Sequence, residues 1–183
     1  FKILHLSDLH NKSFGKNQVF LLNKIRKLNP DIILITGDLI DRRRTDFEPV
    51  LHLLKGLHSI PVYYVPGNHE AWSDCYAQLK DILISHELVV LENEERCIVR
   101  DHQRLYLYGL KDPGFYNKDD HKLKSRDQLD AHLQAWKPEG FSILLSHRPE
   151  YFDVYASHAI DISFSGHAHG GQIRFPFIGA ILA

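Results

Sequence analysis

The sequence predicts a single α/β domain with polar residues at the ends of its strands. In the N-terminal half, short apolar runs alternate with amphipathic stretches, which favours parallel strands joined by crossover helices. Residues 88–110 instead hold three apolar runs in succession, which predicts a three-strand meander and therefore mixed sheets. Acidic residues, histidines and an asparagine follow several of these runs. In open α/β sheets, ligands bind beside the carboxyl ends of the strands, which is where these residues stand.

Eight segments are predicted to be strands. Each is a short run rich in β-branched, leucine or aromatic residues, and each is bounded by residues that form turns. They are residues 1–7, 31–37, 62–67, 88–93, 96–101, 105–110, 141–147 and 160–167.

Four segments are predicted to be helices: residues 17–28, 47–57, 75–86 and, with a weaker pattern, 125–136. In the first of them, apolar residues recur every three positions from Val19 to Leu28, which is typical of a helix with one buried face.

Composition limits the classes of function. The formal net charge of the 183-residue chain is −1, so a generally basic surface for nucleic acid is not indicated. Cys75 and Cys97 form neither a disulfide framework nor a zinc motif. The last segment, "FPFIGAILA", is shorter than the roughly 20 apolar residues of a membrane span, and we expect a strand or docking segment there. We expect residues 1–183 to be a single domain that continues beyond both ends.

Polar clusters follow five of the predicted strands. They are Asp8 and His10 in "SDLH", Asp38 and Asp41 in "GDLID", Asn68 and His69 in "PGNHE", His147 in "SHRP", and His167 and His169 in "SGHAHGG". Each cluster alone has an ordinary explanation, such as a turn, a solvated carboxylate or a satisfied buried histidine. Their recurrence at strand ends predicts one shared site, because the carboxyl ends of parallel strands meet at the same edge.

The donors in these clusters suit a divalent cation. Imidazole, carboxylate and amide groups without a thiolate favour manganese, iron, zinc or magnesium over a structural zinc site. The clusters hold more donors than one four-coordinate ion needs. Two ions about 3.5–4 Å apart that share one carboxylate would use this number of donors. Such a pair stabilises the attacking and leaving oxygens in a displacement at phosphorus.

The ordered set Asp-X-His, Gly-Asp-X-X-Asp, Gly-Asn-His-Glu, a lone His and Gly-His-X-His resembles the calcineurin-like metallophosphoesterases, over nearly the whole chain. The version here, with "GHAHGGQIRFPFIG", is most similar to a bacterial subfamily of membrane-associated or exported phosphoesterases. The resemblance implies a four-layer sandwich of two mixed β-sheets flanked by helices, with a dimetal site at the carboxyl ends of the strands.

The resemblance also implies roles for the site residues. One ion would be held by Asp8, His10, Asp38 and His169, and the other by Asp38, Asn68, His147 and His167, with Asp38 bridging. The nucleophile would be a hydroxide between the ions, of which manganese is favoured. His69 would stabilise the transition state or protonate the leaving group, and Asp41 would orient it.

Three further expectations concern residues around the site. The two histidines of "GHAHG" would extend in the same direction from an extended segment, and Gly166, Gly170 and Gly171 would permit close approach. Arg42 and, less strongly, Arg148 are either solvated loop residues or contacts for substrate phosphate. The loop at residues 111–122 is a candidate determinant of selectivity.

The predicted function is therefore metal-dependent hydrolysis of a phosphoester, by a phosphatase or a phosphodiesterase. The alternative is a pyrophosphohydrolase of a nucleotide-linked lipid precursor, and a nuclease or a non-catalytic scaffold is less favoured. The substrate would be a small or lipid-linked phosphoester. The resemblance implies a place at the bacterial membrane or outside it, with association through a segment that this sequence lacks, and otherwise in the cytoplasm.

Overall fold

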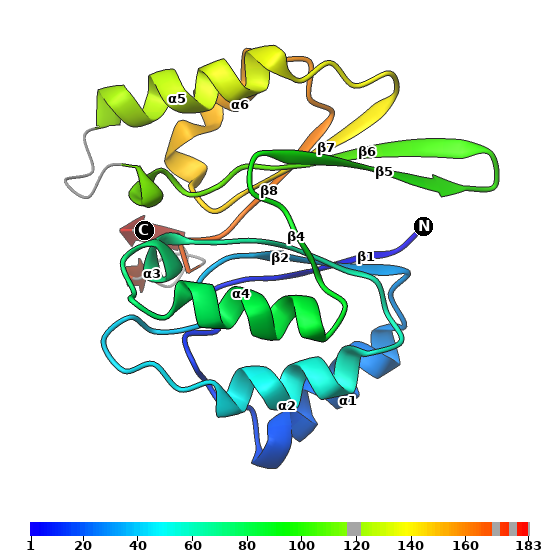
Figure 1. Cartoon of the computed structure of the whole chain (residues 1–183), viewed down its shortest axis with the longest axis vertical. Helices are drawn as coiled ribbons and strands as arrows, with labels where there is room; N and C mark the ends of the chain where they lie inside the picture. The colour runs from blue at the N-terminus through cyan, green and yellow to red at the C-terminus, as the bar shows by residue number, and fades with distance from the viewer. Residues whose placement is uncertain (117–121, 170–172, 176–178, 183) are drawn as a thin grey trace.

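The structure is a computed structural model, and it describes residues 1–116, 122–169, 173–175 and 179–182. Two four-stranded sheets are packed face to face between two layers of helices (Figure 1). The strands of the first sheet, in spatial order, are β1 (Ile3–Leu6), β2 (Ile32–Thr36), β3 (Val62–Val65) and β4 (Val89–Val90). Those of the second sheet are β5 (Glu94–Arg100), β6 (Gln103–Gly109), β7 (Phe141–Ser146) and β8 (Ile162–Ser165). The four-layer α/β architecture is confirmed.

Helices cover the outer face of each sheet. The first sheet is covered by α1 (Val19–Leu28), α2 (Glu48–Leu57) and α4 (Tyr76–Ser85), and the second by α5 (Lys122–Ala135) and α6 (Phe152–Ala156). All four predicted helices are present. The first of them ends at Leu28 because Asn29 takes a left-handed conformation and Pro30 cannot continue the helix.

Three apolar cores hold the layers together, and β2 contributes to two of them. Ile33 and Ile35 face the helices, whereas Ile32 and Leu34 pack between the two sheets. Successive side chains of a strand point to opposite faces, so a strand between two cores must be apolar throughout. This explains the uninterrupted apolar run in "DIILITG".

The meander predicted for residues 88–110 is wrong. The strand β4 pairs in parallel with β3, whereas β5 and β6 form an antiparallel hairpin in the second sheet. The chain changes sheets between Leu91, whose N–H donates to Tyr64, and Asn93, whose N–H donates to Gly109. In the described part of the chain the first sheet is therefore parallel, and mixed pairing occurs in the second. Apolar alternation marks a strand but does not show which sheet it joins.

Several short elements complete the fold. They are the helix α3 (Asn68–Ala71), the 3-10 turns η1 (Lys16–Gln18), η2 (Pro113–Phe115) and η3 (Pro149–Tyr151), and the antiparallel pair β9 (Ile173–Phe175) and β10 (Gly179–Leu182). The strand β10 lies in the expected C-terminal strand or docking segment, of which residues 176–178 and 183 are outside the described residues. No helix in the described ranges has the length and apolar character that crossing a bilayer requires.

Candidate metal centre

The five predicted polar clusters lie at the carboxyl ends of β1, β2, β3, β7 and β8. The structure brings all seven predicted ligands together there, although they are spread from position 8 to position 169. Three groups of side chains offer donor atoms within 4.8 Å of one another, and these groups share Asp38 and His10.

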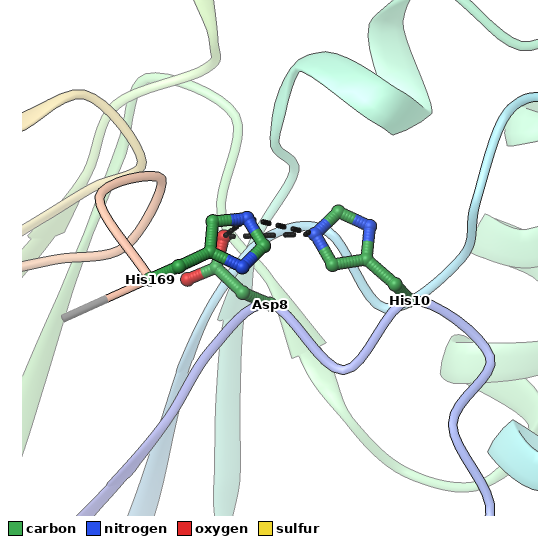
Figure 2. A group of neighbouring side chains, drawn as sticks. All are labelled: Asp8, His10 and His169. Carbon is green, nitrogen blue, oxygen red and sulfur yellow. Dashed lines mark hydrogen bonds and ion pairs between the residues drawn. The ribbon is translucent and has the colours of Figure 1, made fainter. Parts of the chain in front are cut away.

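The first group combines residues from the N-terminal and C-terminal parts of the chain. Asp8 and His10 follow β1 and His169 follows β8, and their side chains point toward one another (Figure 2). The two histidine Nε2 atoms lie 3.2 Å apart, and the ring planes are nearly parallel. An Oδ1 atom of Asp8 lies 3.7 Å from Nε2 of His169 and 4.0 Å from Nε2 of His10. Three donor atoms thus surround a common point.

The second group is more enclosed, with Asp38 and His147 buried and His167 half-buried. It contains Asp38, His147 and His167, and the amide oxygen of Asn68 lies 2.9 Å from Nε2 of His147. Nδ1 of His147 lies 2.7 Å from the carbonyl oxygen of Thr36. If that nitrogen carries the proton and donates it to the carbonyl, Nε2 of the neutral ring is left with a lone pair. Metal-binding histidines are oriented in this way.

Asp38 connects the two groups. Its Oδ2 atom lies 3.7 Å from Nε2 of His10 and 3.3 Å from Nε2 of His147. Burial disfavours ionisation of Asp38, but the hydrogen bond and charge of His147 outweigh burial and lower the pKa of the carboxyl. The same attraction overcomes burial and raises the pKa of His147 to about 9. Without a metal ion the pocket therefore favours an ionised Asp38 carboxylate beside a protonated His147. A bound cation would displace the proton from Nε2 of His147 and supply the positive charge in its place.

Five of the seven predicted ligands lie in tight turns with positive φ angles between 44° and 66°: Asp8, His10, Asp38, His167 and His169. This left-handed conformation costs a non-glycine residue on the order of 1–3 kcal/mol and persists where the surroundings enforce it. Eight further non-glycine residues in the described part of the chain share it, so the conformation marks turns in general. At these five positions it sets the direction in which the chain leaves the strand end.

The turn at "SGHAHGG" differs from the extended segment we expected. Both histidines take left-handed conformations, and Ala168 N–H donates to the carbonyl of Gly166 in a tight turn. The turn redirects the chain so that His167 reaches the second group while His169 reaches the first. Close approach is confirmed at Gly166, where a Cβ atom would lie 2.0 Å from Oγ of Ser7. Gly170 and Gly171 lie outside the described residues.

His69 lies beside the centre, in the first turn of α3. Its Nδ1 accepts a hydrogen bond from the backbone N–H of Arg42 and lies 3.5 Å from a carboxylate oxygen of Asp41. In the neutral imidazole the proton therefore belongs on Nε2. Burial lowers the pKa of His69, against the opposing effect of the Asp38 carboxylate. His69 also forms a group with His10 and Asp38 close enough to share an ion, so both a ligand and a proton donor fit its position.

The two arginines lie in different surroundings. Arg42 is exposed, and its guanidinium carbon lies 4.8 Å from the centre of the Trp72 ring, so it is open to an incoming anion. Arg148 is buried, and its Nε donates to a carboxylate oxygen of Asp112 at 2.7 Å. A buried, hydrogen-bonded pair of this kind ties two loops together. Nη1 of Arg148 also lies 3.5 Å from Nε2 of His167, and its guanidinium carbon lies 5.7 Å from the centre of the same Trp72 ring. Arg148 thus joins the loop of Asp112 to the edge of the site. Of the candidate selectivity loop, residues 117–121 are outside the described residues.

Glu70 is a residue of the site that the sequence analysis missed. Its side chain is fully buried and accepts hydrogen bonds from the backbone N–H groups of Gly67, Asp38 and Ile40. Burial and the nearby Asp38 carboxylate raise the pKa of Glu70 to about 7, against the effect of these three donors. Glu70 thus holds the turn of Asp38 against the turn of Asn68. An acidic residue directly after His69 in "GNHE" was the signal available.

We expect Glu70→Gln to lower the free energy of unfolding by about 1–3 kcal/mol, because a buried backbone donor would lose its acceptor. The glutamine amide has a single acceptor oxygen, and its NH₂ group would face another donor. Metal content should fall as well, since the turns of Asp38 and Asn68 would separate. Urea denaturation and metal analysis test both effects against Glu48→Gln, whose side chain is 75% exposed. Unchanged stability and metal content would contradict this role.

The chain belongs to the calcineurin-like phosphoesterase family, whose model matches residues 1–171. This is a family of metallophosphoesterases, which use divalent metal ions, and the donor set described above fits such ions.

The similar proteins include several bacterial relatives. An uncharacterized metallophosphoesterase of Campylobacter jejuni is 34% identical over 97% of this chain, and one of Helicobacter pylori strain J99 is 32% identical over 96%. The chain spans 46% of the length of each, so it corresponds to about half of these proteins. A bovine protein described as a transmembrane protein with metallophosphoesterase domain is 29% identical over 96% of this chain and 41% of its own length.

The fold is also found among solved structures. Phosphopantetheinyl hydrolase from Mycobacterium tuberculosis superimposes with a TM-score of 0.59 over 96% of this chain and 86% of that one. The sequence identity is 16%, so the likeness concerns the fold alone.

Proposed function

We propose that this chain hydrolyses phosphoesters with two divalent cations, held by the seven ligands that the sequence predicted. The observation that carries the proposal is the position of the Asp38 Oδ2 atom, which lies between His10 and His147 at 3.7 and 3.3 Å. One carboxylate oxygen between two sets of nitrogen donors is an arrangement suited to two neighbouring ions. When bound, such a pair of ions lowers the pKa of water and polarises the oxygens of a phosphoryl group.

The protein's own groups supply the remaining steps. The N–H of Arg42 orients the neutral ring of His69 through Nδ1. His69 acts as an acid from its protonated form, in which Nε2–H gives its proton to the leaving oxygen and the ring returns to the neutral state. The Asp41 carboxylate, 3.5 Å from Nδ1, stabilises the ring when it is positively charged. Asp41 is itself fixed by the backbone N–H of Arg43. Arg42, stacked on Trp72, would hold the phosphate from the solvent side.

Among the ions, we propose manganese first, followed by iron, zinc and magnesium, since all four accept nitrogen and oxygen ligands. The substrate is a phosphomonoester or a phosphodiester. A nucleotide-linked lipid precursor is the second candidate, supported by the similarity to a relative named as a transmembrane protein with metallophosphoesterase domain. The same similarity supports our proposal that the full-length protein acts at a membrane.

The proposal is tested by measuring turnover of an aryl phosphate, a bis-aryl phosphodiester and a nucleotide-linked lipid with each of the four metals. We expect at least one of them to be hydrolysed with manganese, and we expect activity to disappear on chelation and return when metal is restored. Activity that survives exhaustive chelation would overturn the two-metal proposal. Failure to hydrolyse any of the three with any metal would overturn the proposed phosphoesterase activity.

Chelation is expected to remove activity without unfolding the chain. The three apolar cores lie between the layers, and their residues pack without contribution from the predicted ligands. Zinc fingers, by contrast, depend on metal for folding. Circular dichroism before and after exhaustive chelation should give matching spectra. A collapse of the helical signal would mean that the ions are structural.

A further inference from the structure

A strongly basic segment follows the first pair of ligands. Residues 9–30 contain five lysines and arginines and no acidic residue, in a chain whose formal net charge is −1. All five cations are exposed. In the described residues, none of the four lysines in this segment forms an ion pair. The segment therefore carries a concentrated positive charge that the protein itself does not neutralise.

Large apolar side chains are exposed within the same segment. Phe20 is 71% exposed, which is the highest value among the large apolar residues of the described chain. Val19 and Leu28, on the same helix, are 40% and 42% exposed. Figure 1 shows the blue chain leading into α1 at the lower edge of the molecule. A single exposed apolar side chain is ordinary, but apolar side chains surrounded by charged ones are typical of an interaction surface.

The loop that presents Phe20 is held in one conformation. The buried side chain of Gln18 accepts from the N–H of Phe14 and donates to the carbonyls of Lys12 and Pro49. The Phe20 ring packs over Gly15, where a Cβ atom would lie 2.7 Å from it, and Gly15 has a φ of +80°. These contacts fix the conformation of the turn, and the fixed turn keeps Phe20 exposed.

The helix α1 continues this arrangement on its outer face. Leu22 and Ile25 are buried against the first sheet. On the opposite side, Phe20, Lys24 and Lys27 follow one another at spacings of four and three residues, so they form one stripe. The α1 surface is defined here as this stripe together with the loop, namely Lys12, Phe14, Lys16, Phe20, Lys24 and Lys27.

We propose that the α1 surface docks this protein onto an anionic lipid membrane. Lysines attract the negative headgroups, and the exposed side chain of Phe20 would enter the boundary between headgroups and acyl chains. A nucleic acid fits less well, because Val19 and Leu28, exposed aliphatic residues of α1 outside the defined stripe, gain nothing from contact with phosphates. The surface begins at Lys12, two residues after the predicted ligand His10, so one end of it is connected directly to the candidate metal centre.

The test measures binding of the whole chain to sedimented vesicles in the absence of substrate. Vesicles are made of phosphatidylcholine alone or of phosphatidylcholine and phosphatidylglycerol in equal parts. We expect binding to the anionic vesicles that weakens as salt is added. Each basic residue near such a surface strengthens binding about fivefold, so Lys16→Glu with Lys24→Glu should weaken it at least about twentyfold. Phe20→Ser should weaken it about tenfold, through lost apolar contact.

Matched variants on the opposite helical layer serve as controls. Phe152→Ser removes a side chain that is 62% exposed on α6, and Lys124→Glu with Lys137→Glu reverses two exposed charges. Both controls should bind vesicles like the parent. Equal binding to both kinds of vesicle, or equal losses in the control variants, would overturn the proposal. Binding to a duplex oligonucleotide without binding to vesicles would assign the surface to nucleic acid instead.

This docking does not depend on the proposed hydrolysis. The tested residues hold no metal and contact no predicted ligand, so turnover of a soluble aryl phosphate should remain unchanged in all four variants. Circular dichroism confirms that each variant is folded. Loss of vesicle binding with unchanged turnover would support membrane docking by the α1 surface. Loss of both binding and turnover, with a changed spectrum, would mean that the variant is unfolded. It would overturn the assignment of these residues to docking alone.

Discussion

Asp38→Ala is expected to lose at least one metal ion per chain and nearly all turnover. The Oδ2 atom of Asp38 lies near both sets of nitrogen donors, and among the described residues no other carboxylate lies in two of the candidate groups. The Oδ1 atom accepts the backbone N–H of His69, so its removal also loosens the neighbouring turn. Metal ions supply several kcal/mol of transition-state stabilisation, and about 1.4 kcal/mol is tenfold in rate, so the loss should reach at least about 10³-fold.

The measurement is metal content by mass spectrometry, together with turnover of an aryl phosphate. Asp101→Ala is the matched control, because this side chain is 91% exposed and belongs to the β5–β6 hairpin, outside every candidate group. It should keep both ions and full activity. Two ions per chain in purified Asp38→Ala would show that the carboxylate does not bridge them, whatever the activity.

The clustering of the predicted ligands at one edge could be predicted because it depends on a simple property of strands. All five strands followed by predicted ligands run parallel to a neighbour in the same sheet, and parallel strands end at the same edge. A polar residue directly after such a strand is therefore placed by topology, without knowledge of its contacts. Asp8, Asn68 and His147 all follow this rule.

Other features depend on contacts that the sequence does not encode locally. Glu70 binds backbone groups 30 and 32 positions away, and Arg148 binds Asp112 at a separation of 36. The local amino-acid sequence does not show which backbone N–H groups will be buried and will need an acceptor. The left-handed turn at His167 was also missed, because its contacts are with a distant segment: the N–H of His167 donates to the Asp8 carboxylate, and Gly166 packs on Ser7. Packing between distant segments decided these features.

His69→Asn is expected to keep both ions and to lower turnover by about 10²–10⁴-fold, the usual contribution of an acid or base group. The backbone N–H of His69 would still bind Asp38, so the ligand turn should stay in place. The loss should be larger for an alkyl phosphate, whose leaving alkoxide must be protonated, than for an activated aryl phosphate. His102→Asn is the control, because His102 is exposed at the β5–β6 turn and asparagine tolerates its positive φ.

Asp41→Asn should show a milder form of the same pattern. Its carboxylate lies 3.5 Å from Nδ1 of His69, while the N–H of Arg42 already fixes the neutral ring with its proton on Nε2. Removing the charge would therefore destabilise only the protonated ring, and the effect on alkyl substrates should be a fraction of that of His69→Asn. We would measure metal content and the turnover of both substrates in each variant. Together these measurements distinguish a metal ligand from a proton donor at His69. Loss of an ion in His69→Asn would make His69 a ligand. Equal losses on both substrates would instead indicate stabilisation of charge in the transition state, because a proton donor matters most where the leaving group is poorest.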